Sequence, residues 1–285
     1  MGVFSRSWQL TKLSFSVIKQ DKELLLFPLL AGIFSLAYTL ALLFPTILSQ
    51  LWQESADSLV LSGIDYILLF LSYLGLAFIA TFFNVCVVFT TKTRFEGGDA
   101  TFMDSLRFAM SRIHLILAWS LLAASVGLLL RALDSLAERA GAVGGPLINI
   151  LRSVLGVLWS LITIFVVPAM VYHDLGPTEA IKKSIDTYKK TWGESLVRYF
   201  GLGLMQFLFM MLGIVVIVGL VILTTPMGGA PLVIGAGVLY FLAVILIFNV
   251  ANTVFNTALY AYAQDKVAPS GFDAETLQAA FQSKA

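Results

Sequence analysis

The absence of charged side chains over long stretches constrains this chain more than any other feature. No charged residue falls between Glu23 and Glu54, a gap of 30 residues, or between Asp65 and Lys92, a gap of 26. Three further gaps, of 18, 21 and 66 residues, cover 113–130, 153–173 and 199–264. A bilayer core of about 30 Å takes roughly 20 apolar helical residues, so each shorter gap has room for one membrane-spanning helix.

The longest gap has room for two spans. A turn-forming run rich in Thr, Pro and Gly at 224–231 divides it, which predicts a hairpin. A β-barrel would need strands that alternate apolar and polar residues, and runs such as 212–218 do not alternate. The chain is therefore predicted to be an all-α polytopic membrane protein, a single domain over 1–285. Its six transmembrane helices are predicted near 24–48, 64–91, 113–133, 147–172, 196–223 and 231–262.

Composition agrees with this fold class and excludes others. Of the 285 residues, 59% are hydrophobic and only 12% are charged, whereas soluble domains are typically about 25% charged. The formal net charge is +1. These values exclude a disordered chain and an ordinary soluble enzyme. They also argue against nucleic acid as a partner, because such binding depends on excess basic charge.

The basic residues predict the orientation of the chain in the membrane. Fifteen of the 18 Lys and Arg lie before the first span, between spans two and three, between spans four and five, or after span six. The opposite side has only Arg131, Arg139 and Arg152. Because positive charge is retained on the cytoplasmic side, both termini are predicted to be cytoplasmic.

Short amphipathic segments precede three of the spans. They cover 8–19, 102–110 and 178–188, and a similar segment at 273–281 lies near the end of the sequence. Thr101, Thr178 and Asp273 are predicted helix N-caps.

Each of the first three segments is followed by a transmembrane hairpin. This pattern predicts three parallel repeats, at about 3–91, 99–172 and 177–262, with a C-terminal amphipathic helix at 273–283. One interpretation places these helices at the lipid headgroups, with membrane lipids as partners. The other makes them a cytoplasmic docking platform for a protein partner.

A polar stripe marks the sixth span. Its side chains recur at helical spacing and fall on one face: Asn249, Asn252, Thr253, Asn256 and Tyr260. An asparagine facing lipid is costly, so the stripe is predicted to face the protein interior. One interpretation is interhelical hydrogen bonding, with Thr81 and Asn84 of the second span as partners. The other is a polar lining for a solute or a lipid headgroup.

Few other residues suggest chemistry. Pro168 lies within the fourth span and predicts a hinge, because proline interrupts helical hydrogen bonding. The two histidines, His114 and His173, are far apart in the sequence and predict no metal site. No phosphate-binding loop, nucleophile elbow or dinucleotide fingerprint occurs, so no cofactor and no enzymatic activity are expected.

Two stretches resemble known families. The runs at 7–10 (Ser-Trp-Gln-Leu) and 21–30 (Asp-Lys-Glu-Leu-Leu-Leu-Phe-Pro-Leu-Leu) resemble an uncharacterised family of prokaryotic six-helix integral membrane proteins, a domain of unknown function. That resemblance implies the cytoplasmic, or inner, membrane of a prokaryote. The connector at 177–184 is similar to one in the membrane domain of glycerophosphodiester phosphodiesterases. The catalytic barrel of those enzymes is not in the sequence, so no activity and no site residues are carried over.

Taken together, these features predict a non-enzymatic integral membrane protein, an accessory or scaffold component of the cytoplasmic membrane. The alternative is a passive pathway or flippase-like transporter for a small solute or lipid, lined by the stripe of the sixth span.

Overall fold

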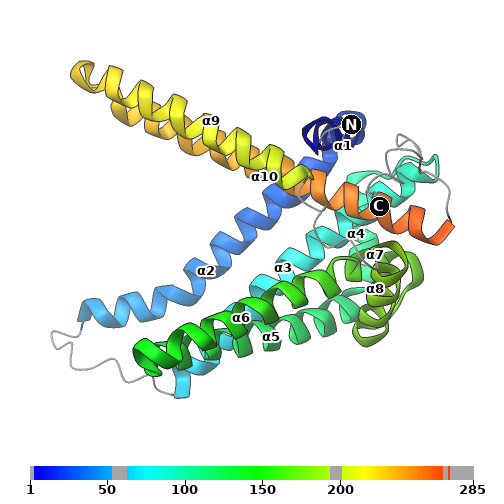
Figure 1. Ribbon diagram of the computed structural model, residues 1–285, viewed down its shortest axis with the longest axis horizontal. Coiled ribbons are helices and arrows are strands. Elements are labelled where there is room, and N and C mark those ends of the chain that lie inside the picture. The colour runs from blue at the N-terminus through cyan, green and yellow to red at the C-terminus, as the bar shows by residue number, and fades with distance from the viewer. Residues whose placement is uncertain (1–2, 53–62, 193–200, 266–268, 270–285) are drawn as a thin grey trace. The chain divides into compact units, whose positions relative to one another are not determined.

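A computed structural model of the chain describes residues 3–52, 63–192, 201–265 and 269 (Figure 1). These residues form α-helices and short 3-10 helices joined by turns, without a strand among them. Six helices in this part of the chain are long and apolar enough to cross a membrane: Lys22–Phe44, Ile67–Phe95, Ile113–Arg139, Gly144–His173, Leu202–Thr224 and Ala230–Gln264. Each overlaps one predicted span, so the predicted all-α fold with six spans is confirmed.

The chain divides into two compact units. The first contains residues 1–28, 90–101 and 187–285, and the second contains 29–89 and 102–186. The third helix, α3 (Gly63–Phe95), and the eighth, α8 (Pro177–Trp192), each contribute residues to both units.

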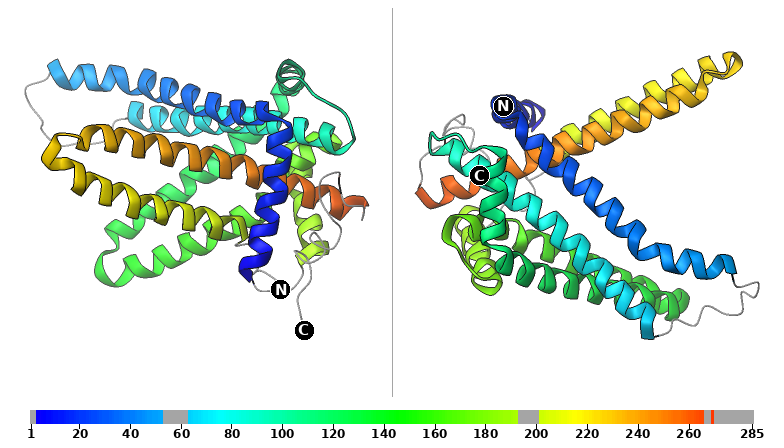
Figure 2. Two further views of the ribbon diagram at one scale, coloured as in Figure 1. Left: turned by 90° about the horizontal axis from the view of Figure 1, so that it is seen from above. Right: turned by 180° about the vertical axis from the view of Figure 1, so that it is seen from behind.

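The first unit is built on a long hairpin of α9 (Gly201–Thr224) and α10 (Ala230–Asp265). The 3-10 turn η2 (Thr225–Met227) joins the two helices and ends at Gly228, whose φ of 72° requires a residue that tolerates left-handed backbone. Helix α1 (Val3–Gln20) contacts both members of the hairpin. It crosses them at a steep angle, as the two views in Figures 1 and 2 agree.

A tyrosine laid over a glycine joins the two helices of this hairpin. The Tyr240 hydroxyl donates a hydrogen bond of 2.8 Å to the Phe209 carbonyl, and its ring occupies the space where Gly213 has no Cβ. The second unit uses the same device between α2 (Leu26–Trp52) and α3. The Tyr38 hydroxyl donates a hydrogen bond of 2.7 Å to the Leu71 carbonyl, and its ring lies against Gly75. In each pair the glycine lies four residues after the carbonyl, which opens that carbonyl to the neighbouring helix.

The second unit adds five further elements to α2 and α3. They are α4 (Phe102–Ser111), α5 (Ile113–Arg139), α6 (Gly141–Thr163), α7 (Val166–His173) and the first part of α8. Helices α5 and α6 form a hairpin in which the Trp119 and Trp159 rings stack at 5.9 Å. Helix α4 packs through Phe108, which stacks on Phe89 of α3 at 4.2 Å.

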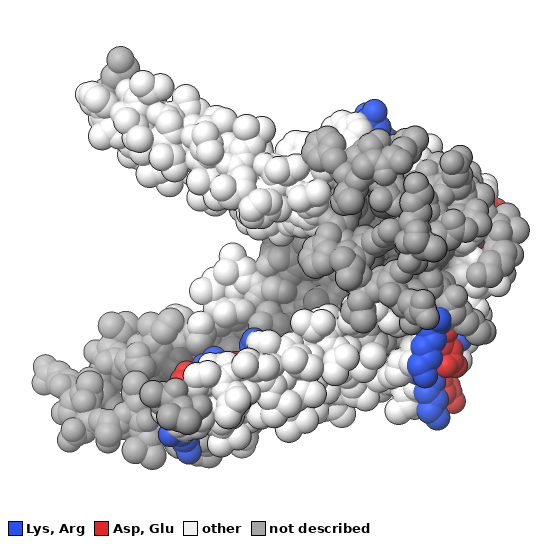
Figure 3. Space-filling view, viewed as in Figure 1, with Lys and Arg blue, Asp and Glu red and all other residues white. Residues whose placement is uncertain are grey.

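Burial is concentrated at one end of the spans. We call the span ends that adjoin the basic segments the basic ends. They lie at Lys22, Phe95, Ile113, His173, Leu202 and Gln264. In the second unit, Val85–Val88 and Phe165–Val171 are buried there. Toward the opposite ends, large apolar side chains are exposed, such as Leu223 at 70% and Leu232 at 82%. The hairpin of α9 and α10 shows no charged atom in Figure 3, as expected for a surface that faces lipid.

The predicted amphipathic segments before the odd-numbered spans are helical and correspond to α1, α4 and α8. The prediction of Thr178 as an N-cap is wrong, because α8 begins one residue earlier at Pro177. Proline suits the first helical position, and Glu179 accepts a 3.4 Å hydrogen bond from the Gly176 N–H. The segment at 273–283, including Asp273, lies outside the described residues, and the threefold repeat stays a prediction.

The tyrosine–glycine contact gives a test of the hairpin. Gly213→Ala places a methyl group inside the Tyr240 ring, so the ring or the helix must move. Overpacking of this kind lowers the free energy of unfolding by about 1–3 kcal/mol. Gly235→Ala on α10 is the matched control, because nothing lies within 4 Å of its Cβ position. We expect Gly213→Ala alone to lower the midpoint of thermal unfolding in detergent. Equal midpoints for the two variants would contradict the contact.

Candidate functional site

The predicted polar stripe follows the last third of α10, in the first unit. Asn249 is exposed, Asn252, Thr253 and Asn256 are half-buried, and Tyr260 is fully buried. The apolar positions between them are buried as well, including Val250, Val254, Ala258 and Leu259. This stretch of α10 is therefore mostly buried, unlike the exposed stretch before it.

Helix length places the stripe relative to the bilayer. Helix α10 has 36 residues and α9 has 24, which corresponds to about 54 Å and 36 Å. Fitting 54 Å into a 30 Å core would need a tilt of about 55°, beyond the usual limit of about 40°. An upright helix that enters the hydrocarbon core at the hairpin turn, at Ala230, has used its roughly 20 core residues by about Asn249. We therefore expect the stripe, which runs from Asn249 to Tyr260, to begin near the membrane boundary.

The other predicted members of the site belong to the second unit. Thr81 is buried and Asn84 is half-buried on α3. Their hydrogen bonding to the stripe of α10 stays a prediction. Hydroxyl groups elsewhere in the spans bond to carbonyls of their own helices; Ser120 to Ile116 at 2.7 Å and Ser125 to Leu121 at 2.8 Å are examples. Such hydroxyls stabilise themselves in lipid without a partner helix.

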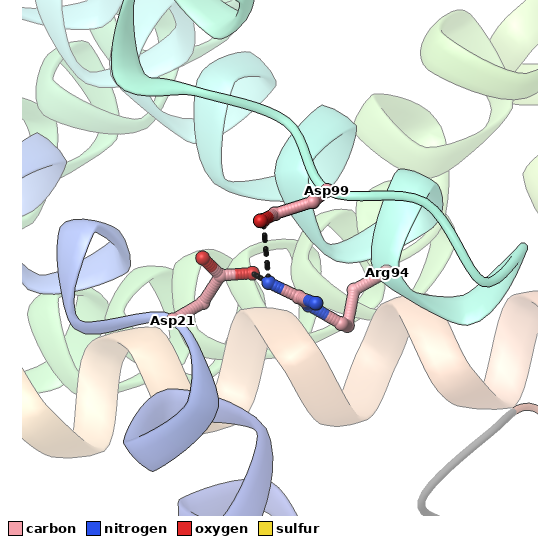
Figure 4. Close-up of polar contacts among 3 residues, drawn as sticks. All are labelled: Asp21, Arg94 and Asp99. Carbon is pink, nitrogen blue, oxygen red and sulfur yellow. Dashed lines mark hydrogen bonds and ion pairs between the residues drawn. The ribbon is translucent and has the colours of Figure 1, made fainter.

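An ion triad ties together the basic ends of the first unit (Figure 4). The Arg94 Nε donates to Asp21 Oδ2 at 2.9 Å, and one terminal guanidinium nitrogen lies 2.9 Å from the same oxygen. The same terminal nitrogen donates to Asp99 Oδ1 at 2.6 Å. The turn at Gly97, with φ of 82°, carries the chain back so that Asp99 reaches the arginine.

The two carboxylates of the triad differ in environment. The Asp21 side chain is 8% exposed, whereas the Asp99 side chain is 79% exposed. Asp21 ends α1 and immediately precedes η1 (Lys22–Leu25), which contacts α10. The Asp21–Arg94 pair, in which only Asp21 is buried, therefore joins the end of α1 to the end of α3. In the sequence, Asp21 and Arg94 stand out only as charged residues and, for Asp21, as part of a family resemblance. Their pairing could not be predicted, because they lie 73 positions apart.

A second ion pair lies at the basic ends of the second unit. The Arg112 Nε is 2.9 Å from Asp174 Oδ1, and the Arg112 guanidinium lies 4.4 Å from the Phe108 ring centroid. Asp174 ends α7 in the left-handed conformation, with φ of 56°. A crevice beside this pair has apolar walls apart from Arg112 and has no room for a water molecule. The site is thus an interhelical clamp, not a solvated pocket.

The fourth span is interrupted near Pro168. Helix α6 ends at Thr163 and α7 begins at Val166, so the break lies three residues before the proline, at Ile164 and Phe165. A proline at 168 cannot donate to the carbonyl of residue 164, which accounts for the interruption. The Phe165 N–H instead donates to the Ser184 Oγ of α8 at 3.1 Å, and both residues are fully buried. Motion at this break stays a prediction.

Arg152 and Cys86 are each engaged in a local contact. Arg152 lies near the opposite end of the fourth span, and its Nε is 3.0 Å from Asp134 Oδ1. Cys86 is buried and its thiol donates to the Ser105 carbonyl at 3.5 Å. On α8, burial raises the pKa of the Tyr188 hydroxyl above its ordinary value. No group of three His, Cys, Asp or Glu side chains within the described ranges is placed to hold a metal ion.

Comparison with known proteins places the chain in a family. Residues 63–272 match a family described as a family of unknown function (DUF6159). The chain belongs to this family. The matched range contains five of the six spans but begins after the two N-terminal runs on which the resemblance was based. No curated protein matches the chain, and the similarity of 177–184 to the phosphodiesterase membrane domain stays a prediction.

The ion triad predicts unequal effects for its two carboxylates. Asp21→Asn weakens a buried, charge-assisted contact of Arg94 and should destabilise the protein by about 1–3 kcal/mol, because the half-buried guanidinium loses its buried counter-ion. Asp99→Asn removes an exposed partner and should cost less than about 1 kcal/mol. Thermal unfolding in detergent measures both variants. A larger loss for Asp99→Asn than for Asp21→Asn would contradict the assignment of Asp21 as the stabilising partner.

Proposed function

We propose that this protein is a non-enzymatic accessory or scaffold component of the cytoplasmic membrane of a prokaryote. In this proposal the six spans anchor the chain, and the basic ends, with both termini, face the cytoplasm. The helices at these ends form a platform for a protein partner. The excess of Lys and Arg at the basic ends supports this orientation.

The observation that carries the proposal is the distribution of burial. The packed parts of both units lie at the basic ends, while the rest of the spans exposes leucine, isoleucine and valine. A solute pathway would need polar groups along the span interior. A rigid platform at one membrane face needs packed and ion-paired helix ends, and this chain has them.

Helix α4 offers the contact surface on this platform. Its inner face is buried through Ser105 and Ala109. Its outer face exposes Met103 at 51% and Met110 at 55%, seven residues apart, and the Arg107 side chain is 77% exposed between them. Exposed methionines adapt to the shape of a partner, and arginine is enriched at protein interfaces.

The transport alternative draws less support from the site. The stripe at Asn249–Tyr260 would line a pathway only if it lay within the hydrocarbon, and the length of α10 leads us to expect it to begin near the membrane boundary. The crevice at Arg112 is narrow and mostly apolar.

Photo-crosslinking in cells tests the proposal. A photoreactive amino acid at Met103 or Met110 should form a discrete adduct with a second protein, because both side chains are exposed on the outer face of α4. The same amino acid at Leu232, which is 82% exposed on the apolar part of α10, is the control and should crosslink to lipid.

Two results would contradict the proposal. One is the lack of any protein adduct from α4 in cells that express the protein at its natural level. The other is solute flux or lipid scrambling by the protein reconstituted in liposomes, if Asn249→Leu with Asn252→Leu abolishes that flux in a stably folded protein.

A further inference from the structure

A stripe of one aromatic and two basic side chains follows the outer face of α1. Trp8 is 41% exposed, and Lys12 and Lys19 are exposed as well. At about 100° per residue, the three positions fall within an arc of roughly 40°. The opposite face of α1 is buried through Ser14, Val17 and Ile18 and their neighbours. The stripe is thus directed away from the core of its own unit.

The position of α1 puts this stripe at the membrane boundary. Helix α1 crosses the hairpin of α9 and α10 steeply (Figure 2), so it lies along the bilayer surface when the hairpin spans the bilayer. The crossing is at Phe248, whose ring lies 5.6 Å from that of Phe15 and 5.8 Å from that of Phe209. Phe248 immediately precedes the polar stripe, where we expect α10 to reach the membrane boundary.

The side chains of the stripe match the chemistry of that boundary. The Lys12 ammonium lies 5.5 Å from the centre of the Trp8 ring, a cation–π contact between residues one helical turn apart. Tryptophan prefers the headgroup level of a bilayer, because its ring is apolar and its N–H needs a polar partner. Lysine beside it can reach lipid phosphates. Helix α1 contains no acidic residue that would oppose an anion.

We propose that Trp8, Lys12 and Lys19 bind the headgroups of anionic phospholipids and anchor α1 to the membrane surface. The other exposed basic helix, α8, differs in that Glu179 and Asp186 accompany its exposed lysines. The proposal is independent of the platform function, because it concerns the outer face of α1 and not that of α4.

Native mass spectrometry of the full chain in detergent, titrated with dioleoylphosphatidylglycerol, tests this proposal. A lysine near an anionic surface contributes a factor of about five in affinity. We expect Lys12→Gln with Lys19→Gln to weaken binding of the first phosphatidylglycerol at least fivefold. Binding of dioleoylphosphatidylcholine, which carries no net charge, should be unchanged, and Lys12→Arg with Lys19→Arg should keep the native affinity.

The matched control is Lys182→Gln with Lys189→Gln, which removes the same charge from two exposed lysines of α8. This control should change phosphatidylglycerol affinity by less than twofold. Equal weakening in the two double variants would show a dependence on net charge alone and would overturn the proposal. So would unchanged affinity in the α1 variant, which would leave the stripe as a surface for a protein partner.

Discussion

Lipid surrounds most of this chain, and lipid tails are as apolar as leucine. Apolar side chains on the spans therefore gain little by packing against one another, and cohesion must come from close packing and polar contacts. The chain supplies such contacts chiefly at the basic ends. The Asp21–Arg94 pair serves the first unit and the Arg112–Asp174 pair serves the second. Between the spans, tyrosine–glycine contacts hold the hairpin of α9 and α10 and the pair of α2 and α3.

This arrangement explains why α10 is so long. Its first two thirds form a hairpin with α9, and its last third passes into the packed region at the basic ends, where residues from Val250 to Tyr260 are mostly buried. If the stripe begins near the membrane boundary, as the length of α10 leads us to expect, its asparagines lie where water, headgroups and protein meet. We propose that their role is then local hydrogen bonding and packing, which agrees with a scaffold better than with a pathway.

The sequence predicts those features whose physical cause is local. A charge in hydrocarbon is costly wherever it occurs, so gaps between charges mark the spans within a few residues. Amphipathic periodicity likewise identifies α1, α4 and α8. The helix break near Pro168 follows from a missing donor, although its position at Ile164 and Phe165 depends on Ser184 of another helix.

Contacts between distant positions could not be predicted in the same way. Nothing near Arg94 in the sequence shows that its partner is Asp21, and nothing near Asp174 shows that its partner is Arg112. The polar stripe is visible in the sequence as a pattern on one helix face. Its depth could not be judged, because helix length beyond the apolar run depends on tertiary packing.

The depth of the stripe is the most direct test of this account. A nitroxide can be placed at Leu239, Asn249 or Tyr262 in a Cys86→Ala background, and its accessibility to oxygen and to a polar nickel reagent in liposomes reports depth. The account predicts a deep position for Leu239, the headgroup level for Asn249 and a position outside the bilayer for Tyr262. A depth for Asn249 equal to that of Leu239 would place the stripe in the hydrocarbon and contradict the account.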